Sequence, residues 1–257
     1  MNRLSSQPVA AGINAESYRA VLALGRHMGY AFVGFGEAKQ FERFVILRHD
    51  VDVDLGYAGQ MAAIETDMGA RSTYFIMLHN PLYNPWSGSG RRLLGQLVAG
   101  GHAIGLHFEP RFHQPVPLSG IEQIVERVEE EAALLATLVG APVDLVSFHQ
   151  PVPQLLNVRL PSSRCRSTYE PEFTESIRYI ADSGGRWRQE SIQQLLSAGT
   201  THRIQFLSHP VLWLAGNQST LQERLAAAVA ARQARVPEEL ADAVNDPERG
   251  MVLFEHE

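Results

Sequence analysis

The chain has little cysteine, no long apolar run and no block of basic residues, and each absence narrows the possible functions. Cys165 is the one cysteine among 257 residues, which excludes an internal disulfide framework. No segment approaches the roughly 18 consecutive apolar residues of a membrane-spanning helix, and the N-terminal residues lack the apolar segment of a signal peptide. With a net charge of −6 and no Lys/Arg cluster, nothing indicates a nucleic acid or anionic lipid partner. We therefore expect a soluble, cytoplasmic protein without a membrane span.

The composition is that of a globular domain. Hydrophobic residues make up 45% of the chain and charged residues 19%, which suffices for one large core. We expect a single domain over residues 1–257, in which residues 1–40 form an N-terminal helical extension. Its helix would begin after Asn14, a side chain suited to capping a helix N-terminus.

Short apolar segments alternate with segments of helical periodicity along the chain. The predicted strands cover residues 44–47, 72–78, 102–106, 143–148, 176–181, 204–207 and 251–254. The predicted helices cover residues 55–68, 91–99, 218–235 and 238–244. A further predicted helix starts with a capping box of Ser119 and Glu122. This alternation is typical of parallel βα units, so we predict an α/β fold with a (β/α) barrel that is closed or nearly closed.

Ionisable side chains follow the first predicted strand directly, in the order Arg48, His49, Asp50, Val51 and Asp52. Side chains alternate between faces along a strand, so Asp50 and Asp52 would point the same way. Two adjacent carboxylates repel each other unless a cation or a proton is shared between them. The pair therefore indicates a divalent metal with one carboxylate as ligand and the other as base. The alternative is a polar loop that caps the next helix.

Histidine and aspartate recur after the later strands as well. The candidates are His107, Glu109 and His113 after the third strand, His149 after the fourth, and Asp182 and His209 further on. In barrel folds the carboxyl ends of the strands carry the active site, so this recurrence favours one common site over isolated surface residues.

The order of these motifs resembles that of the polysaccharide deacetylase superfamily, the NodB-like carbohydrate deacetylases, over roughly residues 44–213. The segment His49 to Asp52 is similar to the His-Asp-Val-Asp branch of that family, and Gly101 to His107 is similar to its second motif. The resemblance implies a distorted or incomplete, seven-stranded barrel. It also implies that Asp50 is the catalytic base and that Asp52 and His107 bind the metal. Residues 182–187 resemble the family's Asp-containing motif with its groove-lining Trp187, and His209 matches the histidine that protonates the leaving amine.

Two positions depart from the family pattern. Arg111 stands where the family has a second histidine, so the third metal ligand is open. His149 is preferred over His113 because a strand end is more rigidly placed than a loop residue, and Glu109 or a water is the further alternative. The family also has an arginine near the base, a charge that Arg48 supplies here unless His149 fills that role.

Four aromatic residues stand where sugar rings could stack on them, or where they could equally belong to the core or the surface: Tyr74, Trp86, Trp187 and Trp213. The expected function is a hydrolase, dependent on Zn²⁺ or a similar divalent ion, that removes an N-acetyl or similar acyl group from an amino sugar or a sugar-containing precursor. The alternatives are an inactive deacetylase-like carbohydrate-binding or assembly module, and a hydrolase of a non-sugar amide. The oligomeric state is not predicted.

Overall fold

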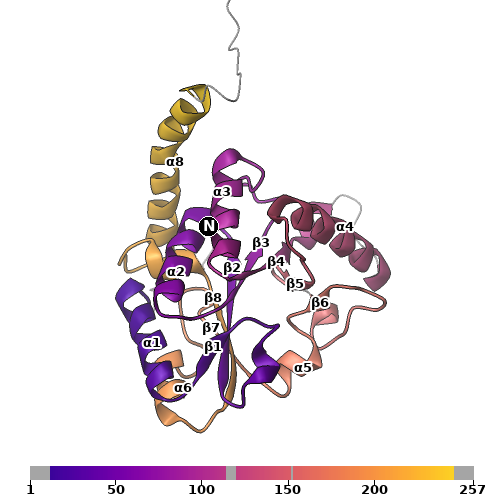
Figure 1. Cartoon of the computed structure of the whole chain (residues 1–257), viewed down its shortest axis with the longest axis vertical. Coiled ribbons are helices and arrows are strands. Elements are labelled where there is room, and N and C mark those ends of the chain that lie inside the picture. Colours follow the sequence, from indigo (N-terminus) through magenta and orange to yellow (C-terminus); the bar gives the residue numbers. More distant parts are fainter. Residues whose placement is uncertain (1–11, 114–119, 152, 246–257) are drawn as a thin grey trace, which may run out of the picture.

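A curled, fully parallel β-sheet forms the centre of the computed structural model, which describes residues 12–113, 120–151 and 153–245, with side chains described up to residue 236 (Figure 1). Its strands are β1 (Ala31–Val33), β2 (Phe44–Val51), β3 (Thr73–Ile76), β4 (Ala103–Phe108), β5 (Leu145–Phe148), β6 (Arg166–Ser167), β7 (Arg178–Ala181) and β8 (Arg203–Ser208). They are arranged in the order β6-β5-β4-β3-β2-β8-β7, and β1 pairs with β2 beside this path. The curled sheet forms a half-barrel, which confirms the predicted incomplete barrel.

Most of the helices cover the outer face of the sheet. The longer ones are α1 (Ala15–His27), α2 (Leu55–Asp67), α3 (Gly88–Ala99), α4 (Ile121–Val139) and α8 (Leu221–Asn245). Shorter ones are α5 (Pro171–Thr174), α6 (Ile192–Ala198) and α7 (Pro210–Leu214), with 3₁₀ turns at Ala38–Gln40, Pro110–His113 and Pro153–Leu155. In Figure 1, α8 extends away from the body, while α3 and α4 lie on the opposite side from α1 and α6. None of the described helices is both long and apolar enough to cross a membrane.

The two faces of β2 have different roles. All eight of its residues are buried, and it pairs with β3 on one side and β8 on the other. Phe44 and Ile46 point into the concave face, where they pack with Phe75 of β3. Val45 and Leu47 point outward into the core beneath the helices. Continuing this alternation, Arg48 and Asp50 lie on the concave face and His49 on the helix side.

The strand β2 is longer than the sequence predicted. We expected it to end at Leu47, but it continues through Val51, so three ionisable residues lie inside the sheet. Their side chains are paired within the protein, which offsets the cost of burying them. The element boundaries elsewhere shift by a few residues; α3, for example, begins at Gly88 because the Ser87 side chain accepts a hydrogen bond from the Gly90 N–H.

Other differences lie near the ends of the chain. The predicted helices at 218–235 and 238–244 form one helix, α8. Residues 31–33, within the expected helical extension, form β1 and pair with β2. The strand expected at 251–254 and the capping residue Ser119 lie outside the described residues.

Candidate metal and catalytic centre

Asp52, His107 and His149 meet at the carboxyl end of the sheet. Asp52 follows β2, His107 lies near the end of β4, and His149 follows β5. One ligand-type atom from each lies within 4.8 Å of the others. The Asp52 Oδ1 atom is 3.1 Å from His107 Nε2 and 3.5 Å from His149 Nδ1, and those two nitrogens are 3.3 Å apart. Three potential ligands from three strand ends therefore surround one point.

The environment of Asp52 fits a bound cation. Its Oδ1 atom is buried and has no hydrogen-bond partner among the described residues, although two imidazole nitrogens lie near it. A buried polar atom without a hydrogen-bond partner lowers the stability of the fold unless a ligand contacts it. Burial raises the pKa of Asp52, but the contacts with His107 and His149 outweigh burial and hold the pKa well below its usual range. One carboxylate and two imidazoles form a donor set suited to Zn²⁺ or a similar ion with open coordination positions.

Ser147 orients the His107 ring. The His107 Nδ1 atom is 2.6 Å from the Ser147 Oγ atom, which donates its own hydrogen to Asp50 at 3.3 Å. With Nδ1–H donating to Ser147, the Nε2 lone pair of His107 faces Asp52, as metal ligation requires. Ser147 lies on β5 opposite His107, so the sheet register itself places this partner.

Asp50 lies on the concave face next to the cluster and is held by Arg48. Arg48 Nε donates to one carboxylate oxygen at 3.0 Å and Nη2 donates to the other at 2.8 Å, with both side chains buried. Burial raises the pKa of Asp50, but the Arg48 charge and neighbouring histidines outweigh burial and lower the pKa. Asp50 is therefore held as a carboxylate, 3.8 Å from His107 Nδ1.

Arg48 is positioned by aromatic groups that no sequence pattern indicated. Its guanidinium lies 4.8 Å from the centre of the Tyr169 ring, and its Nη2 also donates to the Tyr169 hydroxyl at 2.9 Å. The centre of the Phe75 ring lies 5.6 Å from the same guanidinium. The planar guanidinium is thus oriented for the two-point contact with Asp50.

His209 and Asp182 form a second pair that faces the same point. His209 Nδ1 is 2.6 Å from Asp182 Oδ1, and its Nε2 atom is 3.7 Å from Asp52 Oδ2. Asp182 also accepts hydrogen bonds from the His209 backbone and from the Trp213 indole at 2.7 Å. Burial lowers the pKa of His209, but the Asp182 charge outweighs burial and raises the pKa to about 9. His209 is therefore protonated near neutral pH.

The structure separates the two candidates for the third ligand. His149 is in the cluster, and its other ring nitrogen lies 3.7 Å from Glu109. His113 instead contacts Glu131 of α4 at 3.0 Å and stacks on Phe108. Glu109 therefore lies behind His149 rather than beside Asp52.

The aromatic candidates fall into different environments. Tyr74 is fully buried and donates its hydroxyl to Glu65, so it presents no face to a sugar. Trp213 is 1% exposed and serves as a hydrogen-bond donor to Asp182. Trp187 is partly buried against Trp213, and Trp86 is 46% exposed on the surface. Of the four aromatic candidates, Trp86 and Trp187 therefore have accessible surface for stacking, and Trp187 is the one that packs against Trp213, the hydrogen-bond donor to Asp182.

A buried network on the opposite face of β2 was not anticipated. Glu65 of α2 accepts hydrogen bonds from the Tyr18, Tyr74 and Ser72 hydroxyls and contacts His49 Nε2 at 2.7 Å. The other nitrogen of His49 lies 2.8 Å from the Ser208 hydroxyl, one residue before His209. The one signal in the sequence was a glutamate on the apolar face of a predicted helix.

No protein-family profile matches the sequence, and neither does any curated protein. Solved structures are similar to it. A peptidoglycan deacetylase, PdaC, from Bacillus subtilis is 11% identical with a TM-score of 0.45, over 77% of this chain and 85% of its own. A family 4 carbohydrate esterase from Bacillus anthracis is 15% identical with a TM-score of 0.43, over 93% and 96%. A family 4 pseudoenzyme from Bacillus anthracis is 11% identical with a TM-score of 0.40, over 76% and 62%. Every one of these TM-scores is below 0.5, so the function proposed next rests on the chain's own motifs and side chains.

Proposed function

We propose that this protein is a divalent-metal-dependent hydrolase of the polysaccharide deacetylase type, which removes an acetyl or similar acyl group from the nitrogen of an amino sugar. The observation that carries the proposal is the convergence of Asp52, His107 and His149 on one point, with a buried Asp52 oxygen that has no hydrogen-bond partner among the described residues. The amino-sugar substrate follows from the resemblance of the motifs and not from the geometry.

The surrounding groups supply what amide hydrolysis needs. A divalent cation at the cluster would supply a Lewis acid that activates water and polarises the acyl carbonyl. Asp50, ionised and oriented by Arg48, is placed to accept a proton as general base. Arg48 also prevents Asp50 from turning toward the cation as an additional ligand, since both of its oxygens are already bonded.

His209 has the properties of the general acid. Its Nδ1 atom is bound to Asp182, so its Nε2 atom points to the centre, 3.7 Å from Asp52. Because Asp182 holds it protonated near neutral pH, His209 can donate a proton to the departing nitrogen. Base and acid thus approach the centre from β2 and from the end of β8, on separate elements.

Metal content tests the first step of the proposal. The purified protein should contain close to one equivalent of divalent metal, whereas Asp52→Ala and His107→Ala should lose most of it together with all N-acetyl hydrolysis. His27→Ala is the matched control, because His27 is exposed at the end of α1, away from the cluster. Full metal retention in Asp52→Ala or His107→Ala would refute the assignment of the centre.

Hydrolysis of N-acetylated amino sugars tests the second step. A metal-loaded protein that binds N-acetylated sugars without hydrolysing them would instead be a carbohydrate-binding module, the alternative that the sequence left open. Hydrolysis of simple acyl amides at the same rate as acyl amino sugars would identify a non-sugar amidase.

A further inference from the structure

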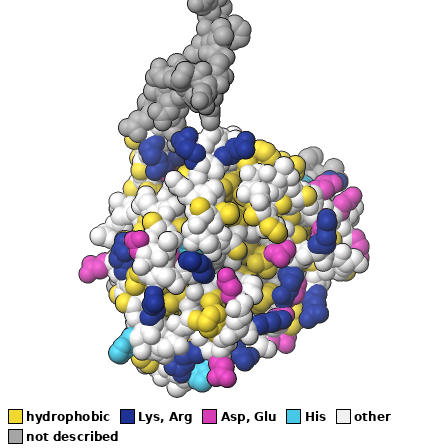
Figure 2. Space-filling model, viewed as in Figure 1, with side chains coloured by type: hydrophobic (Ala, Val, Ile, Leu, Met, Phe, Trp, Pro, Cys, Tyr) yellow, Lys and Arg dark blue, Asp and Glu magenta, His cyan; other side chains and the backbone are white. Residues whose placement is uncertain are grey.

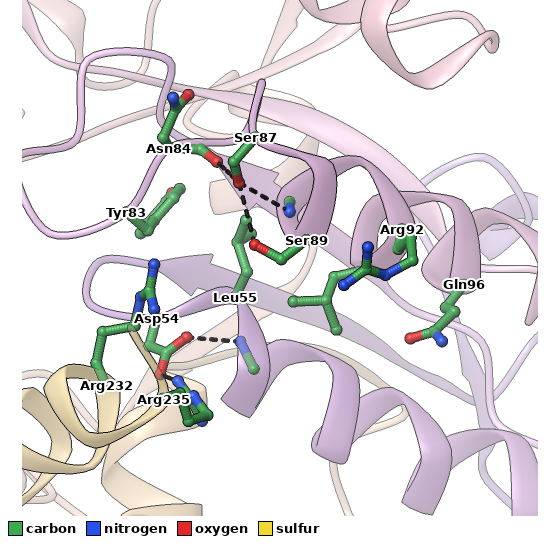
Figure 3. A pocket seen from close by; sticks show the side chains of 13 residues that line it. Asp54, Leu55, Tyr83, Asn84, Ser87, Ser89, Arg92, Gln96, Arg232 and Arg235 are labelled. Carbon is green, nitrogen blue, oxygen red and sulfur yellow. Dashed lines mark hydrogen bonds and ion pairs between the residues drawn. The ribbon is translucent and has the colours of Figure 1, made fainter. Parts of the chain in front are cut away.

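A cavity of about 270 Å³ lies outside the Asp52 cluster, between the N-terminal ends of α2 and α3 and the side of α8 (Figure 3). Arginines from two elements line it, Arg92 on α3 and Arg232 and Arg235 on α8. Ser87 and Ser89, at the start of α3, also line it. The volume is near the lower end of the range for small-ligand pockets, enough for a compact group such as a phosphate.

The cavity is positively charged in an acidic protein. Three arginines and one carboxylate, Asp54, line it, a net of two positive charges, whereas the whole chain carries −6. Asp54 is already engaged, because it caps α2 by accepting from the Gly56 N–H and forms an ion pair with Arg235. Figure 2 shows basic side chains gathered where α8 meets the body. Clustered arginines at a concave surface focus a field that attracts anions.

Hydrogen-bond donors face the same space. Ser87 Oγ accepts a hydrogen bond from the Gly90 N–H at 3.0 Å and donates its own hydrogen to the Asn84 carbonyl at 2.8 Å. The hydroxyl that remains for a ligand is that of Ser89, 3.2 Å from Ser87 Oγ. The positively charged first turn of the twelve-residue helix α3 therefore borders the cavity, because Ser87, Ser89 and Gly90 line it. Proteins commonly bind phosphate through arginine guanidinium groups, hydroxyls and the N–H groups at a helix N-terminus.

The cavity adjoins the proposed catalytic centre. Asp54 stands two residues after Asp52, a separation of at most about 7 Å along the chain. Tyr83, another lining residue, donates its hydroxyl to the Val51 carbonyl, and Asn80 donates to the Asp52 carbonyl. The loop before α3 thus holds residues 51 and 52 and also forms a wall of the cavity.

We propose that this cavity binds a phosphate group, carried by a phosphorylated form of the acyl amino sugar whose acyl group lies at Asp52. The phosphate contacts the guanidinium of Arg92 and the donors at the start of α3, and Arg232 and Arg235 add charge from α8. The identity of the phosphate carrier rests on the proposed function, whereas the phosphate site itself does not.

Binding measured without turnover tests the phosphate site. The full-length protein is titrated by calorimetry with N-acetylglucosamine 1-phosphate, N-acetylglucosamine and inorganic phosphate. The sugar phosphate should bind more tightly than the neutral sugar, and Arg92→Gln or Arg232→Gln should weaken sugar phosphate binding about tenfold, as expected for loss of one charge-assisted hydrogen bond. Arg91→Gln is the matched control, because Arg91 is the exposed neighbour on α3 and does not line the cavity.

The outcomes separate the possible sources of the phosphate. Two results together would support a phosphate carried by the substrate. Inorganic phosphate should inhibit binding of the sugar phosphate, and the protein should hydrolyse the phosphorylated sugar with a higher kcat/KM than the neutral sugar, a preference that falls in Arg92→Gln. Equal affinity for inorganic phosphate and no such preference would support the site but assign it to free phosphate. Phosphate binding that is absent, or unchanged in both Arg92→Gln and Arg232→Gln, would overturn the proposal. If the protein hydrolyses no acyl sugar yet loses phosphate binding in these variants, the proposed function fails and the phosphate site stands.

Discussion

Replacing Glu65 with glutamine should destabilise the protein strongly, because no orientation of an amide satisfies its partners. One carboxylate oxygen of Glu65 contacts the Tyr18 hydroxyl and His49, and the other contacts the hydroxyls of Ser72 and Tyr74. In the Glu65→Gln variant, whichever side of the amide carries the NH₂ group faces two groups that donated to the carboxylate. Glu65 is fully buried, so water cannot replace the lost contacts.

The expected loss follows from these contacts. Two hydrogen bonds to a charged acceptor are lost, each worth about 1.5–3 kcal/mol. We expect the free energy of unfolding to fall by about 3 to 6 kcal/mol in Glu65→Gln. Urea unfolding at pH 7 measures it, with Glu126→Gln as the control on an exposed position of α4. A loss below about 1 kcal/mol, the range of ordinary surface substitutions, would refute the description of this network.

The network around Glu65 makes the free energy of unfolding depend on pH in a defined direction. Burial raises the pKa of Glu65, but His49 and the other donors outweigh burial and lower the pKa to about 2, compared with 4.5 in an unfolded chain. Because the folded pKa is the lower one, this carboxylate stabilises the fold above pH 4.5, and the contribution is lost as the pH falls from about 4.5 to about 2. The unfolding free energy of Glu65→Gln should depend less on pH in this window. If the free energy of unfolding changes equally with pH in the unmodified protein and in Glu65→Gln, Glu65 is not the group responsible.

Three further predictions concern the catalytic centre. In a chelator competition, His149→Ala should weaken metal affinity by well over tenfold. His113→Ala should leave metal affinity unchanged, because the His113 ring contacts Glu131. The reverse result would make His113 the ligand. Asp50→Asn should keep its metal yet lose about 10²- to 10⁴-fold in kcat, the usual worth of a general base, so an unchanged rate would place the base elsewhere. His209 must be protonated to act as the acid, and the Asp182 charge raises its pKa. Asp182→Asn should therefore move the alkaline limb of the plot of kcat against pH to lower pH. If that limb does not move, it belongs to another group.

Much of the architecture could be predicted because it depends on local patterns. Apart from the segment at 251–254, which lies outside the described residues, the apolar strand segments, the helical periodicities between them and the Asn14 cap appear in the structure, since each is set by residues close together in the chain. The recurrence of His and Asp after successive strands also placed the candidate residues at one edge of the sheet. The His-Asp-Val-Asp branch of the polysaccharide deacetylases stays a prediction.

The sequence alone determined which residues were candidates, but the tertiary structure decided which of them meet. Whether His149 or His113 lies beside Asp52 depends on how β4 and β5 pair and where the chain turns after Pro110, and no local pattern specifies either. The strand β2 was predicted too short because Arg48 and Asp50 look like loop residues until their mutual pairing is known. Long-range partners satisfy these buried charges, and sequence spacing does not record long-range partners.

The same reason explains the networks that the sequence did not reveal. Glu65 is an ordinary helix residue until Tyr18, 47 positions earlier, and His49 on the preceding strand surround it. The arginines of α8 can take part in the proposed phosphate site only because Arg235 meets Asp54, 181 positions earlier in the chain, at the start of α2. A charged side chain in a sequence therefore defines a chemical capacity, and its burial and partners, which tertiary packing sets, decide whether that capacity is structural, catalytic or ligand-binding.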